Sequence, residues 1–200
     1  MSPIAKPQTI RMLGIACMIG AVFFSANVIW EVLQPSIVSG VPYDIFHHRI
    51  LWLVFGLLCA PAFFAGQLGY YLSGAAGRNW FSKTIIVLAA VGAAMYTLNA
   101  LSMAVTLRDI SLLGLGLPLS QWISTFLLGI AALFARRVTV WKRLWPVWTG
   151  IAPMILLILP LYLSVFSWRA FAPLATKGLN WLIFGYAVYT QGKASAAQAG

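Results

Sequence analysis

Long apolar runs separated by short polar or charged stretches dominate the chain. A transmembrane helix needs about 20 mostly apolar residues, and the longer runs meet that length. The connecting stretches are too short for a separate soluble domain. The pattern therefore predicts a polytopic, all-α integral membrane protein: one bundle over residues 1–192 and a short flexible tail at 193–200. The six predicted spans are residues 11–34, 46–72, 84–107, 110–135, 146–167 and 175–191.

Composition supports a lipid environment. Of the 200 residues, 62% are apolar and only 8% are charged, with a mean hydropathy of +0.90. Soluble domains carry about a quarter charged residues. A water-soluble fold of this size could not hide so much apolar surface, so the solvent around the bundle must be lipid.

The net charge is +10, and the distribution of the cations along the chain indicates its orientation in the membrane. The cations are scattered in small groups between apolar runs, which argues against a nucleic-acid partner. With six spans, nine cations share the side of both termini and four lie on the other side. The positive-inside rule then predicts cytoplasmic termini and a bacterial-type inner membrane. The nine are Lys6, Arg11, Arg78, Lys83, Arg136, Arg137, Lys142, Arg143 and Lys193, and the four are Arg49, Arg108, Arg169 and Lys177.

The three acidic residues, Glu31, Asp44 and Asp109, all fall at the outer ends of predicted spans. Asp109, in the turn between the third and fourth spans, is predicted to cap the fourth helix. The deep parts of the predicted helices contain no charged residue and no histidine. Because buried ionisable groups mark proton pathways, this pattern disfavours a proton-coupled pump.

A polar stripe at the outer end of the first span suggests a pocket. Asn27, Glu31 and Gln34 are spaced i, i+4 and i+7, so they share one helical face. Asn99 and Gln121 lie on the third and fourth spans. Two interpretations stay open: interfacial polar groups that join helices by hydrogen bonds, or an outward-facing pocket formed by Asn27, Glu31, Asn99 and Gln121.

The only two histidines, His47 and His48, follow Asp44 at the start of the second span. Neighbouring helical residues project about 100° apart, so the two imidazoles cannot grip one metal as an i, i+4 pair does. Asp44 as a helix N-cap explains the stretch more simply. The alternative to this structural interpretation is a metal site formed by one histidine together with Asp44, Asp109 or Glu31.

A basic cluster with flanking tryptophans is predicted on the cytoplasmic side. Arg136, Arg137, Lys142 and Arg143 occupy the loop between the fourth and fifth spans. Such clusters bind anionic lipid headgroups. The alternative is a docking site for an acidic cytoplasmic partner.

Small residues are predicted to let helices approach closely, at residues 89–94 and at Gly114 and Gly116. No Gly-x-Ser-x-Gly elbow and no phosphate-binding glycine motif occurs, and no motif demands a cofactor. The catalytic classes with recognisable signatures are therefore not favoured.

The stretches RMLGIACMIGAVFF and GLNWLIFGYAVYTQGK are similar to the ends of small bacterial inner-membrane proteins with about six spans. This likeness of composition names no activity. The favoured hypothesis is a non-catalytic accessory or scaffold subunit, or a binder of lipid, pigment or quinone. Its partners would be membrane lipids, other membrane subunits or a second copy. The alternatives are a small transporter with the outward pocket and an intramembrane metal enzyme.

Overall fold

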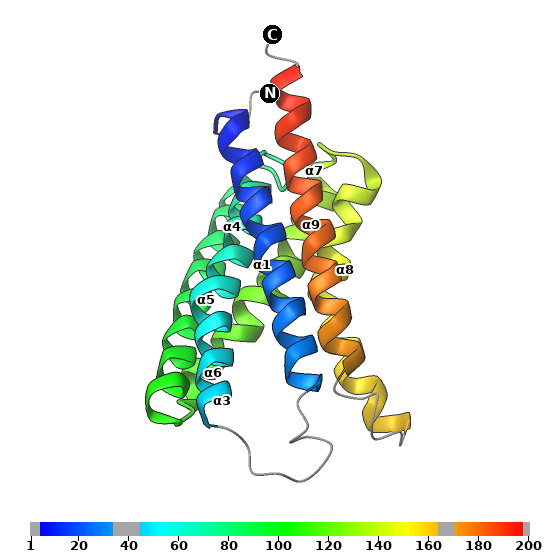
Figure 1. Cartoon of the computed structure of the whole chain (residues 1–200). Helices are drawn as coiled ribbons and strands as arrows, with labels where there is room; N and C mark the ends of the chain where they lie inside the picture. The colour runs from blue at the N-terminus through cyan, green and yellow to red at the C-terminus, as the bar shows by residue number, and fades with distance from the viewer. Residues whose placement is uncertain (1–4, 34–44, 164–170, 198–200) are drawn as a thin grey trace.

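The computed structural model describes residues 5–33, 45–163 and 171–197, and within these ranges the chain forms helices and no β-strand. The helices lie side by side in an elongated bundle (Figure 1). The predicted all-α class is confirmed. Four helices in the described ranges are long and apolar enough to cross a membrane, which indicates a membrane protein. They span Pro7–Ile29, Arg49–Leu72, Trp80–Thr106 and Ser111–Ala135, and they coincide with the first four predicted spans.

The first two predicted spans form long helical stretches. α1 runs over Pro7–Leu33. The second stretch is continuous: α3 (Ile45–Leu53) leads into the π-helical η1 (Val54–Cys59) and then α4 (Ala60–Leu72). Pro61 lies in the first turn of α4 and lacks a backbone N–H. Its position accounts for the irregular hydrogen bonding just before it, because the helix loses a donor there.

The third stretch, α5 (Trp80–Thr106), has clear start and stop signals. At its start, the side chain of Asn79 accepts a hydrogen bond of 2.9 Å from the backbone N–H of Ser82. Asparagine is a favoured N-cap because it satisfies an N–H that the helix cannot. At its end, Leu107 adopts a left-handed conformation with φ of 58°. This conformation turns the chain out of the helix.

The fourth stretch divides into three helical pieces. α6 (Ser111–Gly114) is followed by the π-helical η2 (Pro118–Ile123) and by α7 (Ser124–Ala135). The proline that opens η2 removes a backbone donor and disturbs the regular ladder. α7 ends at Arg136, whose φ is 52° and whose N–H donates to the Ala132 carbonyl at 3.0 Å.

The last two helices begin before the predicted spans. α8 covers Val140–Leu163 and α9 covers Phe171–Ala197, against predicted spans of 146–167 and 175–191. A hydropathy pattern marks the apolar part of a helix, whereas the helix itself extends through flanking basic and aromatic residues. α9 continues into the stretch 193–200 that was predicted as a tail. That α8 and α9 cross a membrane stays a prediction.

α1 packs along α9 and α4, and α8 packs against α7 and α9. The start of α1 and the end of α9 lie at the same end of the bundle (Figure 1). α4 and α9 run parallel, and residues that face each other across the two helices differ by 118 in residue number. Within it, Phe63 stacks on Trp181 and the Ser73 hydroxyl donates to Gln191 Oε1. The register brings residues from the two ends of the chain into one core.

Two predicted glycines bring α5 close to the fourth stretch: Gly92 on α5, which faces the start of η2, and Gly116, just before η2. A Cβ on Gly92 would lie 2.7 Å from the backbone N of Ser120, and a Cβ on Gly116 would overlap the backbone N of Tyr96. Only glycine allows the backbones to come this close. The expected close approach is therefore confirmed at Gly92 and Gly116. It is wrong for Gly114, where a Cβ would meet its nearest atom at an ordinary 3.8 Å.

Large apolar side chains cover the outside of the described helices. Ile19 and Phe23 on α1 and Val87 and Leu98 on α5 are each about half exposed or more. Soluble monomers rarely expose contiguous apolar surface on this scale. The exposed side chains agree with a bundle whose surroundings are lipid.

Candidate functional site

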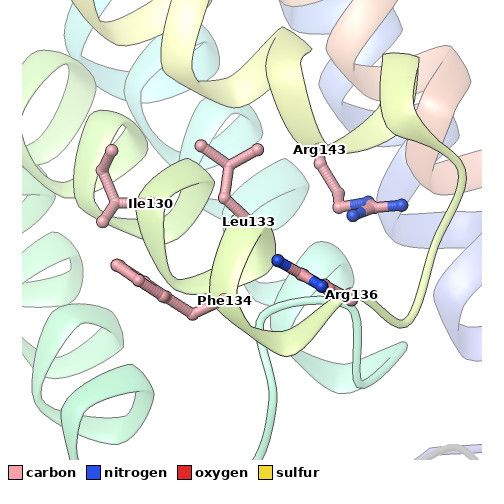
Figure 2. A pocket seen from close by; sticks show the side chains of 5 residues that line it. All are labelled: Ile130, Leu133, Phe134, Arg136 and Arg143. Atoms are coloured by element: carbon pink, nitrogen blue, oxygen red, sulfur yellow. The ribbon is translucent and has the colours of Figure 1, made fainter.

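The turn between α7 and α8 borders a cavity of about 790 Å³. Ile130, Leu133 and Phe134 come from the last turns of α7, Arg136 ends that helix and Arg143 lies in the first turn of α8. Figure 2 shows the apolar side chains and the two guanidinium groups around this turn. The cavity therefore combines an apolar wall with two positive charges.

The apolar wall follows from helical spacing. Ile130, Leu133 and Phe134 are related as i, i+3 and i+4, so they share one face of α7. Phe134 is 84% exposed, which leaves its ring available to surrounding molecules. A chain-like apolar ligand could lie along this face without displacing any core residue.

The two arginines are held differently. Arg143 donates from Nε to the Val138 carbonyl at 2.6 Å, which fixes its guanidinium beside the turn and leaves its Nη groups as donors. Arg136 is placed by the left-handed end of α7. Among the described side chains the only carboxylate is that of Asp109, which binds Asn99 at the α5–α6 turn, so no described acid pairs with either guanidinium. Paired arginines of this kind bind phosphate or carboxylate through two parallel hydrogen bonds.

The other two members of the predicted basic cluster do not line the cavity. Arg137 is exposed. The ammonium of Lys142 lies 5.5 Å from the centre of the Trp141 ring, and partial burial lowers the pKa of Lys142. The structure thus brings two of the four predicted residues, Arg136 and Arg143, to one site and leaves the others beside it.

Of the residues proposed for an outward pocket, Asn27 and Asn99 have separate hydrogen-bond partners. Asn27 donates to the Leu51 carbonyl at 3.4 Å, which links α1 to α3. Asn99 lies on α5 and Gln121 on η2, and both are buried. The side chain of Glu31 lies outside the described residues. The four-residue pocket therefore stays a prediction.

Asn99 bridges the turn from α5 to α6. Its Nδ2 donates to Asp109 Oδ1 at 2.8 Å, and its Oδ1 accepts from the backbone N–H of Ile110 at 3.0 Å. The predicted role of Asp109 as a helix cap is wrong, because Ile110 holds the N-cap position and no side chain caps α6. The Asp109 carboxylate instead fixes Asn99.

A polar cluster lies between α4 and the fourth stretch. Gln67, which is 1% exposed, donates from Nε2 to the Ser120 carbonyl, to Ser124 Oγ at 3.1 Å and to Thr125 Oγ1 at 2.6 Å. Gln67 Oε1 and Gln121 Oε1 are buried and find no partner in the described ranges. Sequence analysis named Gln121 and missed Gln67, although a lone amide in an apolar run is the signal that could have found it.

The metal hypothesis is not tested by the described side chains. Within the described ranges, no group of three His, Cys, Asp or Glu residues could hold a metal ion. Of the four candidate ligands, only Asp109 has a described side chain, and it binds Asn99. The side chains of His47, His48 and Asp44 lie outside the described residues.

Lys177 has an unexpected position. The sequence analysis counts Lys177 among the four cations on the outer side, near the start of the sixth predicted span. In the structure α9 begins six residues before Lys177, whose side chain is only 6% exposed. The signal in the sequence is its spacing: Trp181 follows at i+4, on the same face of α9. A lysine and a tryptophan on one helical face fit either a buried face or an exposed interfacial face, and only the neighbouring helices distinguish the two.

Comparison with protein families, curated proteins and solved structures found no match to this chain. The class of protein is therefore defined by the features of the chain itself. Over residues 5–33, 45–163 and 171–197 it is a helical bundle without β-strands, with four helices long and apolar enough to cross a membrane. At the α7–α8 turn it has an arginine-lined cavity with an exposed apolar wall.

Proposed function

We propose that this chain is a non-catalytic, multi-pass protein of a bacterial-type inner membrane that binds an anionic phospholipid in the α7–α8 cavity. The observation that carries the proposal is the junction of two guanidinium groups with the apolar face of Ile130, Leu133 and Phe134. A phospholipid has the same two-part chemistry, with a phosphate next to acyl chains.

The proposed topology has six spans, with α8 and α9 as the fifth and sixth, and cytoplasmic termini. It rests on the excess of cations at the end that holds the termini and the α7–α8 turn. In Figure 1 this turn lies at the same end of the bundle as the start of α1 and the end of α9. The cavity would then lie at the level of the cytoplasmic headgroups, where anionic lipids attract basic segments.

The chemistry of the cavity fits a headgroup with the beginning of its acyl chains. A volume of about 790 Å³ lies within the usual range for small-ligand sites. Arg136 and Arg143 would share the phosphate oxygens, and the ring of Phe134 would lie against an acyl chain. Trp141 and Trp148, both partly exposed on α8, suit the interfacial belt beside it.

The lining also favours binding over catalysis. Arginine stays protonated in proteins, so neither guanidinium can act as a general base. Leucine, isoleucine and phenylalanine provide no reactive group. The proposed role is therefore to hold a lipid at a helix turn, as a structural subunit or lipid-dependent scaffold would.

Native mass spectrometry in a neutral detergent tests the proposal with phosphatidylglycerol and phosphatidylcholine of equal acyl length. The wild-type protein should retain phosphatidylglycerol in preference. Because charge-assisted contacts are lost, Arg136→Gln with Arg143→Gln should bind it about tenfold more weakly. Arg137→Gln with Lys142→Gln is the matched control, because it removes the same two positive charges outside the cavity, and it should bind like the wild type. Equal binding by the double variant would overturn the proposal.

A small solute-binding or transport function is the second candidate. The observation in its favour is the pair of buried amide oxygens, Gln67 Oε1 and Gln121 Oε1, that lack hydrogen-bond donors in the described ranges. Buried acceptors of this kind are costly unless a donor reaches them. Uptake of labelled polar solutes into proteoliposomes would test it: transport lost in Gln121→Leu supports the function, and no uptake by the wild type contradicts it.

A further inference from the structure

Lys177 is a buried cation inside the helical bundle. Its side chain is 6% exposed, and its ammonium lies 4.9 Å from the centre of the Phe24 ring on α1. The buried thiol of Cys59, at the end of η1, lies in the neighbourhood of Lys177. An aromatic face attracts a cation, but far less than water or a carboxylate does. Lys177 therefore needs a stronger partner than Phe24.

No carboxylate among the described side chains meets that need. Asp109, the only acidic residue with a described side chain, binds Asn99 at the α5–α6 turn. The other two acids of the chain, Glu31 and Asp44, have side chains outside the described residues. A buried lysine without a carboxylate partner among the described side chains is costly in a helical bundle and marks a candidate functional site.

Two further donors flank Lys177 on α9. Asn180 and Trp181 follow at i+3 and i+4, and side chains on a helix lean toward its N-terminal end, so both lean toward the turn that holds Lys177. Asn180 Nδ2 and Trp181 Nε1 are both buried and have no acceptor in the described ranges. Two buried N–H donors without an acceptor in the described ranges, next to a buried lysine, define a site for negatively charged oxygen atoms.

The surroundings of these donors are apolar. The Trp181 indole stacks on Phe63, and Phe24 lies 5.8 Å from Phe63 between ring centres. Cys59 is buried on the α4 side. A hydrophilic anion would gain nothing from these walls, whereas a molecule with an apolar tail would.

We propose that Lys177, Asn180 and Trp181 bind the anionic headgroup, carboxylate or phosphate, of an apolar-tailed molecule. This site is distinct from the α7–α8 cavity. Lys177 lies about 9 Å along α9 from its start at Phe171, and that start lies at the end of the bundle opposite the α7–α8 turn (Figure 1). The two sites can therefore be tested independently.

Thermal unfolding in a neutral maltoside detergent tests the site with three probes of one tail length: dodecanoate, dodecyl phosphate and dodecanol. Dodecanoate or dodecyl phosphate should raise the Tm of the wild type in a saturable manner, and dodecanol should not. The larger shift distinguishes a carboxylate from a phosphate ligand. In Lys177→Met, the apparent affinity for the anion should fall at least about tenfold, because a charge-assisted contact is lost.

Lys193→Met is the matched control, since Lys193 is exposed on the same helix, and it should respond like the wild type. All variants meet the same micelle, so partitioning of the probes cancels in the comparison. Lys177→Met should fold, because it removes a buried charge and keeps the volume; Lys177→Gln serves as a second variant. Trp181→Phe keeps the ring contact but removes the N–H, and should weaken binding less than Lys177→Met.

Two results would overturn the proposal. One is an equal dodecanoate response in the wild type and Lys177→Met. The other is that the anionic probes do not change the Tm of the wild type, while Lys177→Met loses as much stability as Glu31→Gln or Asp44→Asn. That result would mean that Lys177 pairs with an acidic residue of the chain itself.

Discussion

The Trp181 indole lies almost flat on the Phe63 ring, with ring centroids 4.5 Å apart and planes inclined by 18°. Both side chains are buried to within 1%. This contact ties α9 to α4, and Phe184 meets the same indole edge-on with centroids 5.5 Å apart. The aromatic core therefore joins the end of the chain to its first half.

Trp181→Ala should destabilise the bundle by about 3 kcal/mol or more, because a large buried ring is replaced by a cavity. Trp181→Phe should cost much less, since a ring still lies on Phe63. Unfolding in mixed micelles with increasing denaturing detergent measures the difference. Trp80→Ala is the control, because Trp80 is 77% exposed. Equal losses at Trp80 and Trp181 would contradict the assignment of the core.

Gly116→Ala should destabilise the protein, because the new Cβ would overlap the backbone N of Tyr96 and push η2 away from α5. Overpacking of this kind costs about 1–3 kcal/mol. Gly114→Ala, two residues earlier, meets its nearest atom at 3.8 Å and should be tolerated. Unfolding midpoints of the two variants provide the comparison, and a tolerated Gly116→Ala would mean that the helices are not in close contact here.

Gln67→Leu should destabilise the bundle by about 1–3 kcal/mol, because the Thr125 hydroxyl loses the donor Gln67 Nε2 and the Ser120 carbonyl keeps only its side-chain bond from Ser124 Oγ. Gln67→Glu should cost more, since a carboxylate oxygen would face the Ser120 carbonyl. Gln8→Leu, at an exposed position on α1, is the control. A Gln67→Leu variant as stable as the control would show that the cluster contributes little.

Asn99→Ala should cost more stability than Asp109→Ala. The first substitution removes both hydrogen bonds across the α5–α6 turn, and the second removes only one. Each bond contributes about 1 kcal/mol, with somewhat more where a charge is involved. Asp109→Asn keeps an acceptor oxygen for Asn99 and should lie near the wild type. Thermal unfolding ranks the three variants, and the reverse order would exclude Asn99 as the centre of the turn.

The proposed six-span topology predicts the labelling of single engineered cysteines. Cys17 and Cys59 are buried and should not react. A membrane-impermeant maleimide should label Ser111→Cys, at the exposed start of α6, on intact spheroplasts. It should label Ala196→Cys, near the end of α9, only after permeabilisation. Labelling of Ala196→Cys from outside would place the two ends of the chain on opposite sides of the membrane.

The helices could be predicted from local sequence because the length of an apolar run is a one-dimensional property. The predicted span 84–107 and the observed α5 at Trp80–Thr106 differ by a few residues, for this reason. Helix starts were harder. Polar and aromatic residues at the beginning of α8 belong to the helix without being apolar, so the pattern placed its start six residues late, at 146 instead of Val140.

Side-chain roles could be predicted only where the partners lie close in the sequence, or where the distribution of positive charge along the chain is informative. The basic loop was located in this way, and two of its members, Arg136 and Arg143, line the cavity. Asp109 was assigned to the wrong partner, because a helix cap is the commonest local role for an aspartate and the competing amide comes from the preceding helix. Gln67 was missed because its three acceptors lie more than fifty residues away.

By itself, the sequence determined the lipid-like environment, the helical class and the approximate position of each helix, since these depend on composition and on runs of neighbouring residues. The tertiary structure alone decided that Lys177 is buried and that Phe24 lies beside it. Burial is a property of the neighbours, and the neighbours of Lys177 come from α1 and η1, more than a hundred residues away. The same spacing along α9 would describe an exposed interfacial face if α1 and α4 packed elsewhere.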